Sequence, residues 1–203
     1  MPKVTALRSG RPGRARVELD GAAWRTLPLD VVARAGLAVG LELDRPRLRT
    51  LRRELRRHEA LDEAARALRT RDCSSASLRK RLERRGVAEE PGREALHALE
   101  RAGILDDKRY ARSKAERLAE RGAGDALIRW ELEQDGVPAE LVEEALSALE
   151  RETERAVRIA AGSRDAGRTA RALARKGFSE DALEAAFPAL VAELRSPTVR
   201  YED

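Results

Sequence analysis

Hydrophobic residues near the start of the chain alternate with polar ones, as in residues 3–7 and 15–19. A period of two predicts β-strands. The pair Asp20-Gly21 favours a tight hairpin turn before a further strand at 24–27. We therefore expect a small antiparallel sheet at the N-terminus, followed by a short helix that ends at Gly36.

From Pro46 onward the apolar residues recur at helical spacing, and the stretch to about Arg71 forms one long helix or two with a bend. An internal repeat organises this part of the chain. When Gly86, Gly136 and Gly177 are aligned, the surrounding segments superpose without a gap, and six apolar columns match in all three copies. The columns are Ala65, Ala115 and Ala156; Leu68, Leu118 and Ile159; Leu82, Leu132 and Leu173; Val87, Val137 and Phe178; Leu96, Leu146 and Phe187; and Leu99, Leu149 and Leu190.

Each copy is interpreted as three helices. The first carries the Ala and Leu columns, the second ends at the aligned glycine, and the third presents its apolar face ten and thirteen residues later. Ser74, Gly124 and Asp165 stand where the second helices begin and are acceptable N-caps. A module of about 40 to 50 residues is too small to be stable alone, so the copies are expected to stack into an elongated array. The predicted fold is mainly α with a small β-containing domain. The predicted domains are 1–57, three repeats at 58–107, 108–150 and 151–195, and a tail at 196–203.

Charge is unevenly distributed along the chain. Residues 1–57 hold 14 Lys and Arg against 6 Asp and Glu, a net charge of +8, whereas the remainder has a net charge of −3. Only five of the 41 basic residues are lysines, and guanidinium groups suit phosphate and carboxylate partners. The same excess of arginine also fits a GC-rich genome. The strongest candidate for a direct DNA contact is therefore the N-terminal end.

Several classes of protein are disfavoured by composition. No apolar run is long enough to cross a membrane and no signal peptide is visible, which predicts a cytoplasmic protein. The single Cys73 excludes an internal disulfide, and His58 and His97 are too far apart for zinc-ligand spacing. No nucleotide-binding glycine-rich loop occurs, so any ATP dependence belongs to the partner. Neither a cofactor nor a metal is expected.

The adjacent acids Asp106 and Asp107 are the one candidate for nuclease chemistry. A two-metal nuclease needs three or four converging carboxylates and a water-positioning base, and no acid, His or Lys stands at a spacing that completes such a set. The pair directly precedes a helical segment with Tyr110, Ala115 and Leu118 on one face. One aspartate is expected to cap that helix while the other favours the positive end of its dipole.

The segments SSASLRKRLERRGV, ALERAGILDDKRYARSKAERLAERGAG and LIRWELEQDGVPAELVEEAL carry a family resemblance. In this order they resemble the bacterial RecX regulatory family, whose members show Ser-x-x-Glu-Leu, Leu-Asp-Asp-x-Arg-aromatic-Ala and Arg-x-x-Leu-x-x-x-Gly segments. The match covers roughly residues 58–192, and its middle motif is the specific part. Ser77 replaces a frequent Glu, and Gln134-Asp135 replaces a frequent basic pair, which puts in doubt whether the middle repeat touches nucleic acid.

The resemblance implies three tandem repeats in a curved protein that lies in the helical groove of the RecA filament on single-stranded DNA. Binding there hinders filament extension, strand exchange, ATP hydrolysis and co-protease activity. The resemblance implies no catalysis by this chain.

Two groups of residues are the binding candidates. The expected sequence-independent DNA contacts lie on the hairpin and the following helix: Arg8, Arg11, Arg14, Arg16, Arg52, Arg53, Arg56 and Arg57. The second helices of the repeats supply contacts to RecA or DNA: Arg79, Lys80, Arg84, Arg85, Arg129, Trp130, Arg168, Arg171, Arg175 and Lys176. These basic helix faces either grip a partner or are simply solvated. Trp130 either packs against the adjacent repeat or anchors a partner, and Trp24 is expected in the core of the sheet.

The sequence thus predicts a monomeric, non-enzymatic regulator of homologous recombination and DNA repair. Its expected partners are the RecA filament and single-stranded or double-stranded DNA. The alternative is an autonomous DNA-binding protein of helix-turn-helix type, since three-helix modules also build that fold. Such a reader needs Asn, Gln or Arg aimed at base edges, and the basic second helices lack Asn and Gln.

Overall fold

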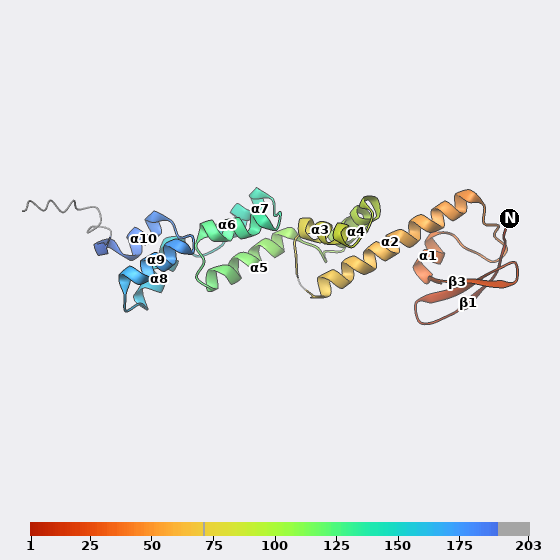
Figure 1. Cartoon of the computed structure of the whole chain (residues 1–203), viewed down its shortest axis with the longest axis horizontal. Helices are drawn as coiled ribbons and strands as arrows, with labels where there is room; N and C mark the ends of the chain where they lie inside the picture. The colour runs from red at the N-terminus through yellow and green to blue at the C-terminus, as the bar shows by residue number, and fades with distance from the viewer. Residues whose placement is uncertain (71, 191–203) are drawn as a thin grey trace, which may run out of the picture. The chain divides into compact units, whose positions relative to one another are not determined.

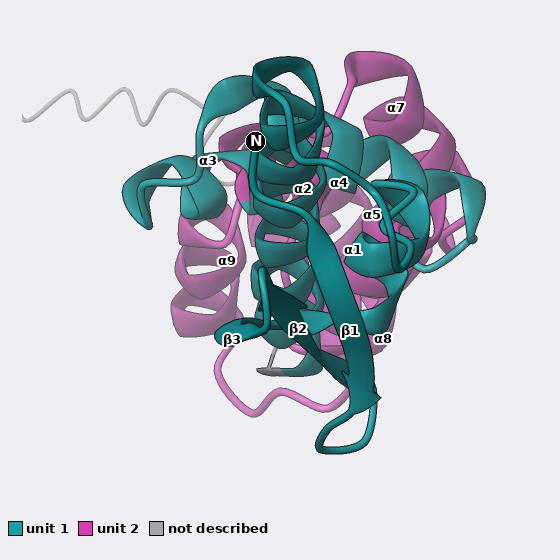
Figure 2. Ribbon diagram, turned by 90° about the vertical axis from the view of Figure 1, so that its right-hand side faces the viewer, with its two compact units in different colours: residues 1–71, 78–104 teal, residues 72–77, 105–203 magenta. Residues whose placement is uncertain are grey.

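The computed structural model describes residues 1–70 and 72–190, so the predicted tail and the last residues of the third repeat lie outside the described residues. The described chain is mainly helical with a small sheet at its N-terminus (Figure 1), as the sequence predicted. It divides into two compact units, one of residues 1–71 and 78–104 and one of 72–77 and 105–203 (Figure 2). Within the described residues, no helix has both the length and the apolarity that a membrane span requires.

The predicted N-terminal sheet is confirmed. It has three antiparallel strands in the order β1-β2-β3: β1 Val4–Ser9, β2 Arg14–Leu19 and β3 Ala22–Pro28. Asp20 and Gly21 both adopt positive φ angles, of 49° and 81°, which is the conformation of the tight turn that joins β2 to β3. The short helix α1 (Leu29–Arg34) follows, as expected. Together these elements place a hairpin rich in arginine over a small apolar core.

Trp24 is not a residue of that core, contrary to the prediction. The core of the first unit is built from aliphatic side chains such as Val4, Val17 and Val31. Trp24 keeps 37% of its surface exposed and lines a shallow cleft between β3 and α2. The core is already filled by small branched side chains, so the large indole remains at its edge.

The long helix α2 (Arg45–Thr70) runs without interruption and serves two cores. Its N-terminal half contributes the buried Leu51 to the core of the sheet, whereas Ala60, Ala64 and Ala67 are buried further along. The domain boundary expected at residue 57 therefore falls inside a helix. Of the two forms left open by the sequence, a single long helix is the one observed.

Three successive helix triplets follow the predicted repeat. Their bounds are α2 with α3 (Ser75–Arg84) and α4 (Glu89–Arg101); α5 (Asp107–Glu120), α6 (Asp125–Gln134) and α7 (Ala139–Ser147); and α8 (Glu152–Ala161), α9 (Ala166–Arg175) and α10 (Glu180–Ala186). Every residue of the six apolar columns is buried or partly buried. The six repeated apolar columns therefore correspond to side chains that are buried or partly buried in each of the three helix triplets.

The aligned glycines end the second helices in the predicted left-handed conformation. Gly86 has a φ of 77°, its N–H donates to the carbonyl of Glu83, and the next N–H, of Val87, donates to the carbonyl of Leu82. This pair of hydrogen bonds is the Schellman motif, and it brings Val87 back to Leu82. Gly136 and Gly177 have φ angles of 73° and 81° in the same setting.

Candidate nucleic-acid and partner interface

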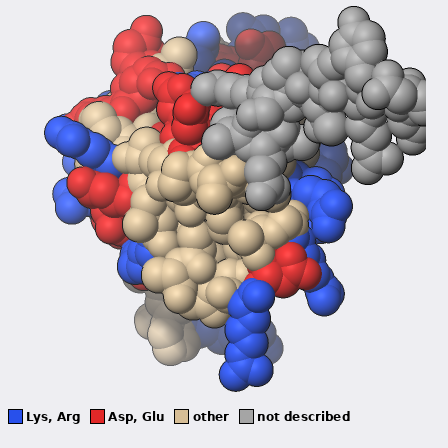
Figure 3. All heavy atoms as spheres, turned by 90° about the vertical axis from the view of Figure 1, so that its left-hand side faces the viewer, with Lys and Arg blue, Asp and Glu red and all other residues tan. Residues whose placement is uncertain are grey.

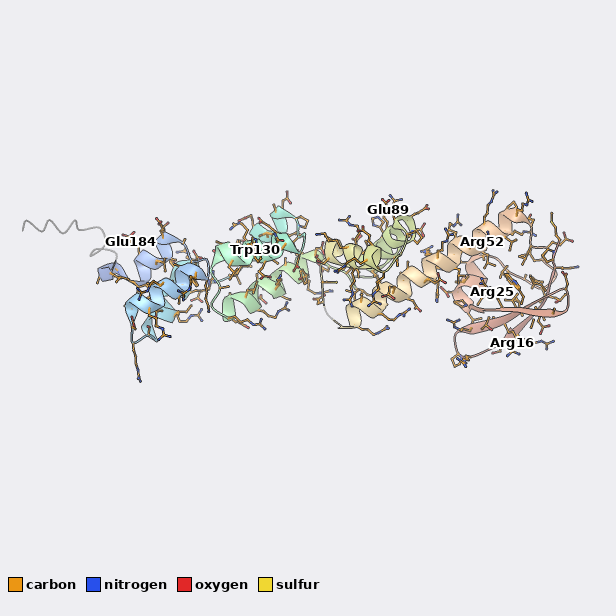
Figure 4. All side chains as sticks on the ribbon, viewed as in Figure 1. Arg16, Arg25, Arg52, Glu89, Trp130 and Glu184 are labelled. Carbon is orange, nitrogen blue, oxygen red and sulfur yellow. The ribbon has the colours of Figure 1, made fainter. Side chains whose placement is uncertain are left out.

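The exposed arginines of the N-terminal hairpin are positioned by the strand pleat. Ala15 and Val17 on β2 point into the core, so the alternating Arg14 and Arg16 are exposed, and Arg11 is exposed in the connecting loop. Figure 4 shows Arg16 on the outer side of the sheet. These three guanidinium groups make no ion pair with any described residue.

Arg8 differs from its neighbours because it already has a carboxylate partner. It lies directly opposite Arg16 in the β1–β2 register, and like charges in this position repel. Its Nε donates to Oε1 of Glu18 at 2.7 Å, and this hydrogen bond and the charge of Glu18 raise the pKa of the Arg8 guanidinium. Arg16 is therefore the freer of the two cations.

The four arginines of α2 fall into two pairs. Arg52 and Arg56 are exposed and unpaired among the described residues, and Figure 4 shows Arg52 on α2. Arg53 bonds the buried Glu54 at 3.2 Å, and Arg57 lies 3.7 Å from Glu94 of α4. Only the first pair has guanidinium groups without an ion-pair partner among the described residues.

The second helices of repeats one and three expose most of the predicted cations. Six of them are exposed and form no ion pair among the described residues: Arg79, Lys80 and Arg84 on α3, and Arg168, Arg171 and Arg175 on α9. Arg85 instead binds Glu63 of α2 at 2.5 Å. Lys176 donates to the carbonyl of Arg121 at 2.9 Å. Two of the predicted contact residues thus already have partners within the protein.

In the middle repeat, α6 presents an aromatic surface. Arg129 forms a bidentate pair with Glu143 of α7, with N–O distances of 2.7 and 2.8 Å. Trp130 leaves 53% of its surface exposed on α6 (Figure 4) and occupies the column of Lys80 and Arg171, which are also exposed. The same face of all three second helices is therefore open to solvent.

Asp106 caps its helix, as expected from the sequence, because its carboxylate accepts the N–H of Arg109 at 2.9 Å. Asp107 has a further partner that the sequence did not indicate. Its two oxygens accept the N–H and the hydroxyl of Ser75, at 2.7 and 2.6 Å. Asp107 therefore joins two repeats. Among the described residues, no group of acids, His or Cys is suited to hold a metal.

The start of α3 packs on the glycine turn of repeat two. The hydroxyls of Ser74 and Ser77 both donate to the carbonyl of Asp135, which immediately precedes Gly136. A Cβ on Gly136 would stand 2.6 Å from the Cβ of Ala76. The glycine is therefore needed both for its φ angle and for this close approach.

The start of α6 packs on the glycine turn of repeat three in the same way. The N–H of Gly124 donates to the carbonyl of Lys176 at 2.8 Å, and that of Ala126 to Gly177 at 3.2 Å. The N–H of Asp125 donates to Glu152, the first residue of α8, at 2.6 Å. Asp125 and Ser75 occupy equivalent columns, and each donates to an acid that opens the next repeat.

Buried basic residues support both inter-repeat contacts. Arg155, 3% exposed, donates to the carbonyls of Ala123 and Glu150 at 2.8 and 3.1 Å and pairs with the carboxylate of Asp125. Burial raises the pKa of the Asp125 carboxyl; the charge of Arg155 acts against this shift and that of Glu152 adds to it.

Lys114 stands in the same column of repeat two, 22 residues before the glycine, and is 7% exposed. It binds Asp135 at 2.6 Å and Glu131 at 2.9 Å, and the hydroxyl of Tyr110 also donates to Asp135. Within repeat two, Lys114 and Tyr110 thus hold the side chain of the residue whose carbonyl accepts the hydroxyls of Ser74 and Ser77. The sequence analysis did not identify this column, because repeat one has Ala64 in place of a basic residue. A basic residue at this position in the other two copies, on the buried face of the first helix, was the feature that could have indicated it.

The three-helix arrangement of the middle repeat also occurs in a known protein domain. Residues 106–146, which span α5, α6 and most of α7, match the family model described as RecX, second three-helix domain. No curated protein matches the chain.

Two solved structures share the fold. "Crystal structure of regulatory protein RecX" aligns with a TM-score of 0.80 and 22% identity over 93% of this chain and 100% of that one. "Crystal structure of RecX from Lactobacillus salivarius" aligns with a TM-score of 0.59 and 20% identity over 68% of this chain and 97% of that one. The middle repeat therefore matches a RecX three-helix domain, and the chain has the fold of two solved RecX structures.

Proposed function

We propose that this protein is a RecX-type regulator, which binds the RecA filament on single-stranded DNA and slows its activities without catalysing a reaction. The match of residues 106–146 to a RecX domain carries this proposal. The exposed cations of α3 and α9 support it, because they offer charge to phosphates or to an acidic protein surface. We further propose that the hairpin arginines contact DNA without sequence preference.

The purified protein is expected to slow DNA-dependent ATP hydrolysis by RecA at amounts well below equimolar to RecA. A bound regulator at one place in a filament can affect many subunits, so a small amount suffices. The steady-state rate of ATP hydrolysis on a long single strand measures the effect. A rate unchanged at every ratio would contradict the proposed function.

Matched variants locate the surface responsible. Replacing Arg171 and Arg175 by Gln removes two exposed, unpaired charges from α9, and inhibition is expected to weaken. Replacing Arg129 and Glu143 by Gln removes a pair whose charges cancel, and inhibition is expected to persist. Equal inhibition by both variants would rule out α9 as a contact surface.

DNA binding in the absence of RecA is expected to depend on the hairpin. The variant with Arg11, Arg14 and Arg16 replaced by Gln should bind a labelled oligonucleotide more weakly. The slope of log K against log[salt] is negative, and its magnitude should decrease by about 2 to 3 in this variant, because each lost phosphate contact removes about 0.7 to 0.9. Fluorescence anisotropy at several salt concentrations measures both quantities.

The matched control removes Arg8 and Glu18 together, each replaced by Gln. This pair contributes no net charge, so the slope should remain that of the unchanged protein. If the triple variant kept the full slope, the hairpin would not be the DNA contact.

A further inference from the structure

The second helices of consecutive repeats meet end to end. The carbonyls that directly follow α9, at Lys176 and Gly177, accept the N–H groups of Gly124 and Ala126 at the start of α6. The last carbonyl of α6, at Asp135, accepts hydroxyls from the first turn of α3. In each case the positive end of one helix dipole faces the negative end of the other. The contact is thus a repeated unit of the structure.

The far end of α3 lacks such a neighbour. No described residue donates a hydrogen bond to the carbonyl of Arg85 or Gly86, and a Cβ on Gly86 would meet nothing within 4 Å. Gly136 and Gly177, in contrast, each have a neighbour 2.6 Å from where their Cβ would stand. A cleft of about 780 Å³ lies at the Gly86 turn, which we call the Gly86 cleft. It is lined by Arg56, Glu59, Ala60, Glu63, Arg66 and residues 85–88 and 91.

The walls of the Gly86 cleft suit the start of a helix. In the two occupied contacts, the N–H of Ser75 or Asp125 donates to an acid on the first helix of the next repeat. In the Gly86 cleft, the first helix α2 supplies Glu59, which has no ion pair among the described residues, and Glu63, which is already paired with Arg85. Acceptor carbonyls and carboxylates together fit the free N–H groups and the positive dipole of a helix N-terminus.

The complementary free element is the start of α9. Ala166 stands in the column of Ser75 and Asp125, whose N–H groups donate to an acid of the next repeat. Gly167 stands in the column of Ala126, whose N–H donates to the carbonyl of Gly177. Neither the N–H of Ala166 nor that of Gly167 is bonded to a described residue. The column of Gly167 holds Ala76 and Ala126 in the other copies, so a small residue is kept where close approach requires it. Figure 3 views the end of the second unit that α8, α9 and α10 occupy, and its centre is formed by uncharged side chains.

We propose that the start of α9 of one molecule docks in the Gly86 cleft of a second copy, so that the end-to-end series of second helices continues from molecule to molecule. The contact joins two different surfaces and therefore generates head-to-tail assemblies rather than two-fold dimers. It consists of only a few hydrogen bonds, so association is expected at high protein concentration.

Cross-linking between two single-cysteine variants tests the proposal. In a Cys73→Ser background, one protein carries Ala88→Cys beside the Gly86 cleft and the other Ala166→Cys at the start of α9; both side chains are exposed. Mixed with a short bismaleimide, the two should form a heterodimer in several-fold higher yield than either forms with itself. The control replaces Ala88→Cys by Ala139→Cys, an exposed position at the start of α7.

Sedimentation velocity without a cross-linker gives a second measurement. The mean sedimentation coefficient of the unchanged protein should rise with concentration, whereas Ala88→Trp, which fills the cleft from an exposed position, should remain monomeric with an unchanged circular dichroism spectrum. Equal yields from the test and control pairs, or a sedimentation coefficient that is independent of concentration, would overturn the proposal. Neither experiment contains RecA or DNA, so its outcome is independent of the proposed function.

Discussion

Replacing Arg155 by Met should lower the free energy of unfolding by about 3 kcal/mol, because the substitution removes one partner of a buried ion pair. Methionine fills much of the volume but donates no hydrogen bond. The carbonyl of Ala123 and the carboxylate of Asp125 would lose their guanidinium partner, and Arg155 would no longer lie over the ring of Phe178. The estimate lies at the lower end of the usual range because the Asp125 side chain is 36% exposed. Urea denaturation measures the loss.

Arg158→Met is the matched control. Arg158 lies one turn further along α8 and pairs with Glu150, but its side chain is 67% exposed, so its removal should cost about 0–1 kcal/mol. Similar losses for the two variants would show that Arg155 does not hold repeats two and three together.

The pH dependence gives an independent check on Arg155. The folded-state pKa of Asp125 is raised, so its charged form destabilises the fold above that pKa, and the penalty disappears as the pH falls below the usual aspartate value of about 3.9. Without Arg155 this penalty is larger at neutral pH. The difference between Arg155→Met and the unchanged protein should therefore shrink between neutral pH and about pH 4.

The repeat was predictable because each copy has the same local requirements for residue type. A helix that ends at a left-handed glycine requires that residue type, and a buried position requires an apolar one, so Gly86 and Leu82 recur as Gly136 and Leu132. The hairpin was predictable for a similar reason, since Asp20-Gly21 adopts a conformation that few other pairs adopt readily. Local requirements of this kind leave a residue-type signature in one sequence.

Contacts between repeats left a weaker signature because several residue types satisfy them. The acid that accepts the N–H of the preceding helix is Asp107 in one repeat and Glu152 in the next, and it stands at different distances from the aligned glycine. The buried cation is Lys114 or Arg155, types that sequence reasoning assigns to the surface. Among the binding candidates, ion pairing to a distant residue such as Glu63 depends on tertiary structure and was not visible in the sequence.

The second large effect is expected at Gly177, where the local and the inter-repeat requirement coincide. Gly177→Ala places a side chain at a φ of 81°, which costs about 1–2 kcal/mol for an L-residue. The new Cβ would also stand 2.6 Å from the backbone nitrogen of Leu127, and such overpacking costs about 1–3 kcal/mol. A total loss of about 2–5 kcal/mol in urea denaturation is expected, because backbone of two repeats has to separate.

Gly86→Ala separates these two causes, because Gly86 has nearly the same φ, 77°, but open space around its Cβ position. It should show the conformational cost alone, about 1–2 kcal/mol. The excess loss at Gly177 then measures the packing of α6 on repeat three. Gly136→Ala should fall between the two, because its Cβ would meet the side chain of Ala76 and not a backbone atom. If the free energy of unfolding fell equally in all three variants, the glycines would serve only to end their helices. Close packing between repeats would then not require glycine at these positions.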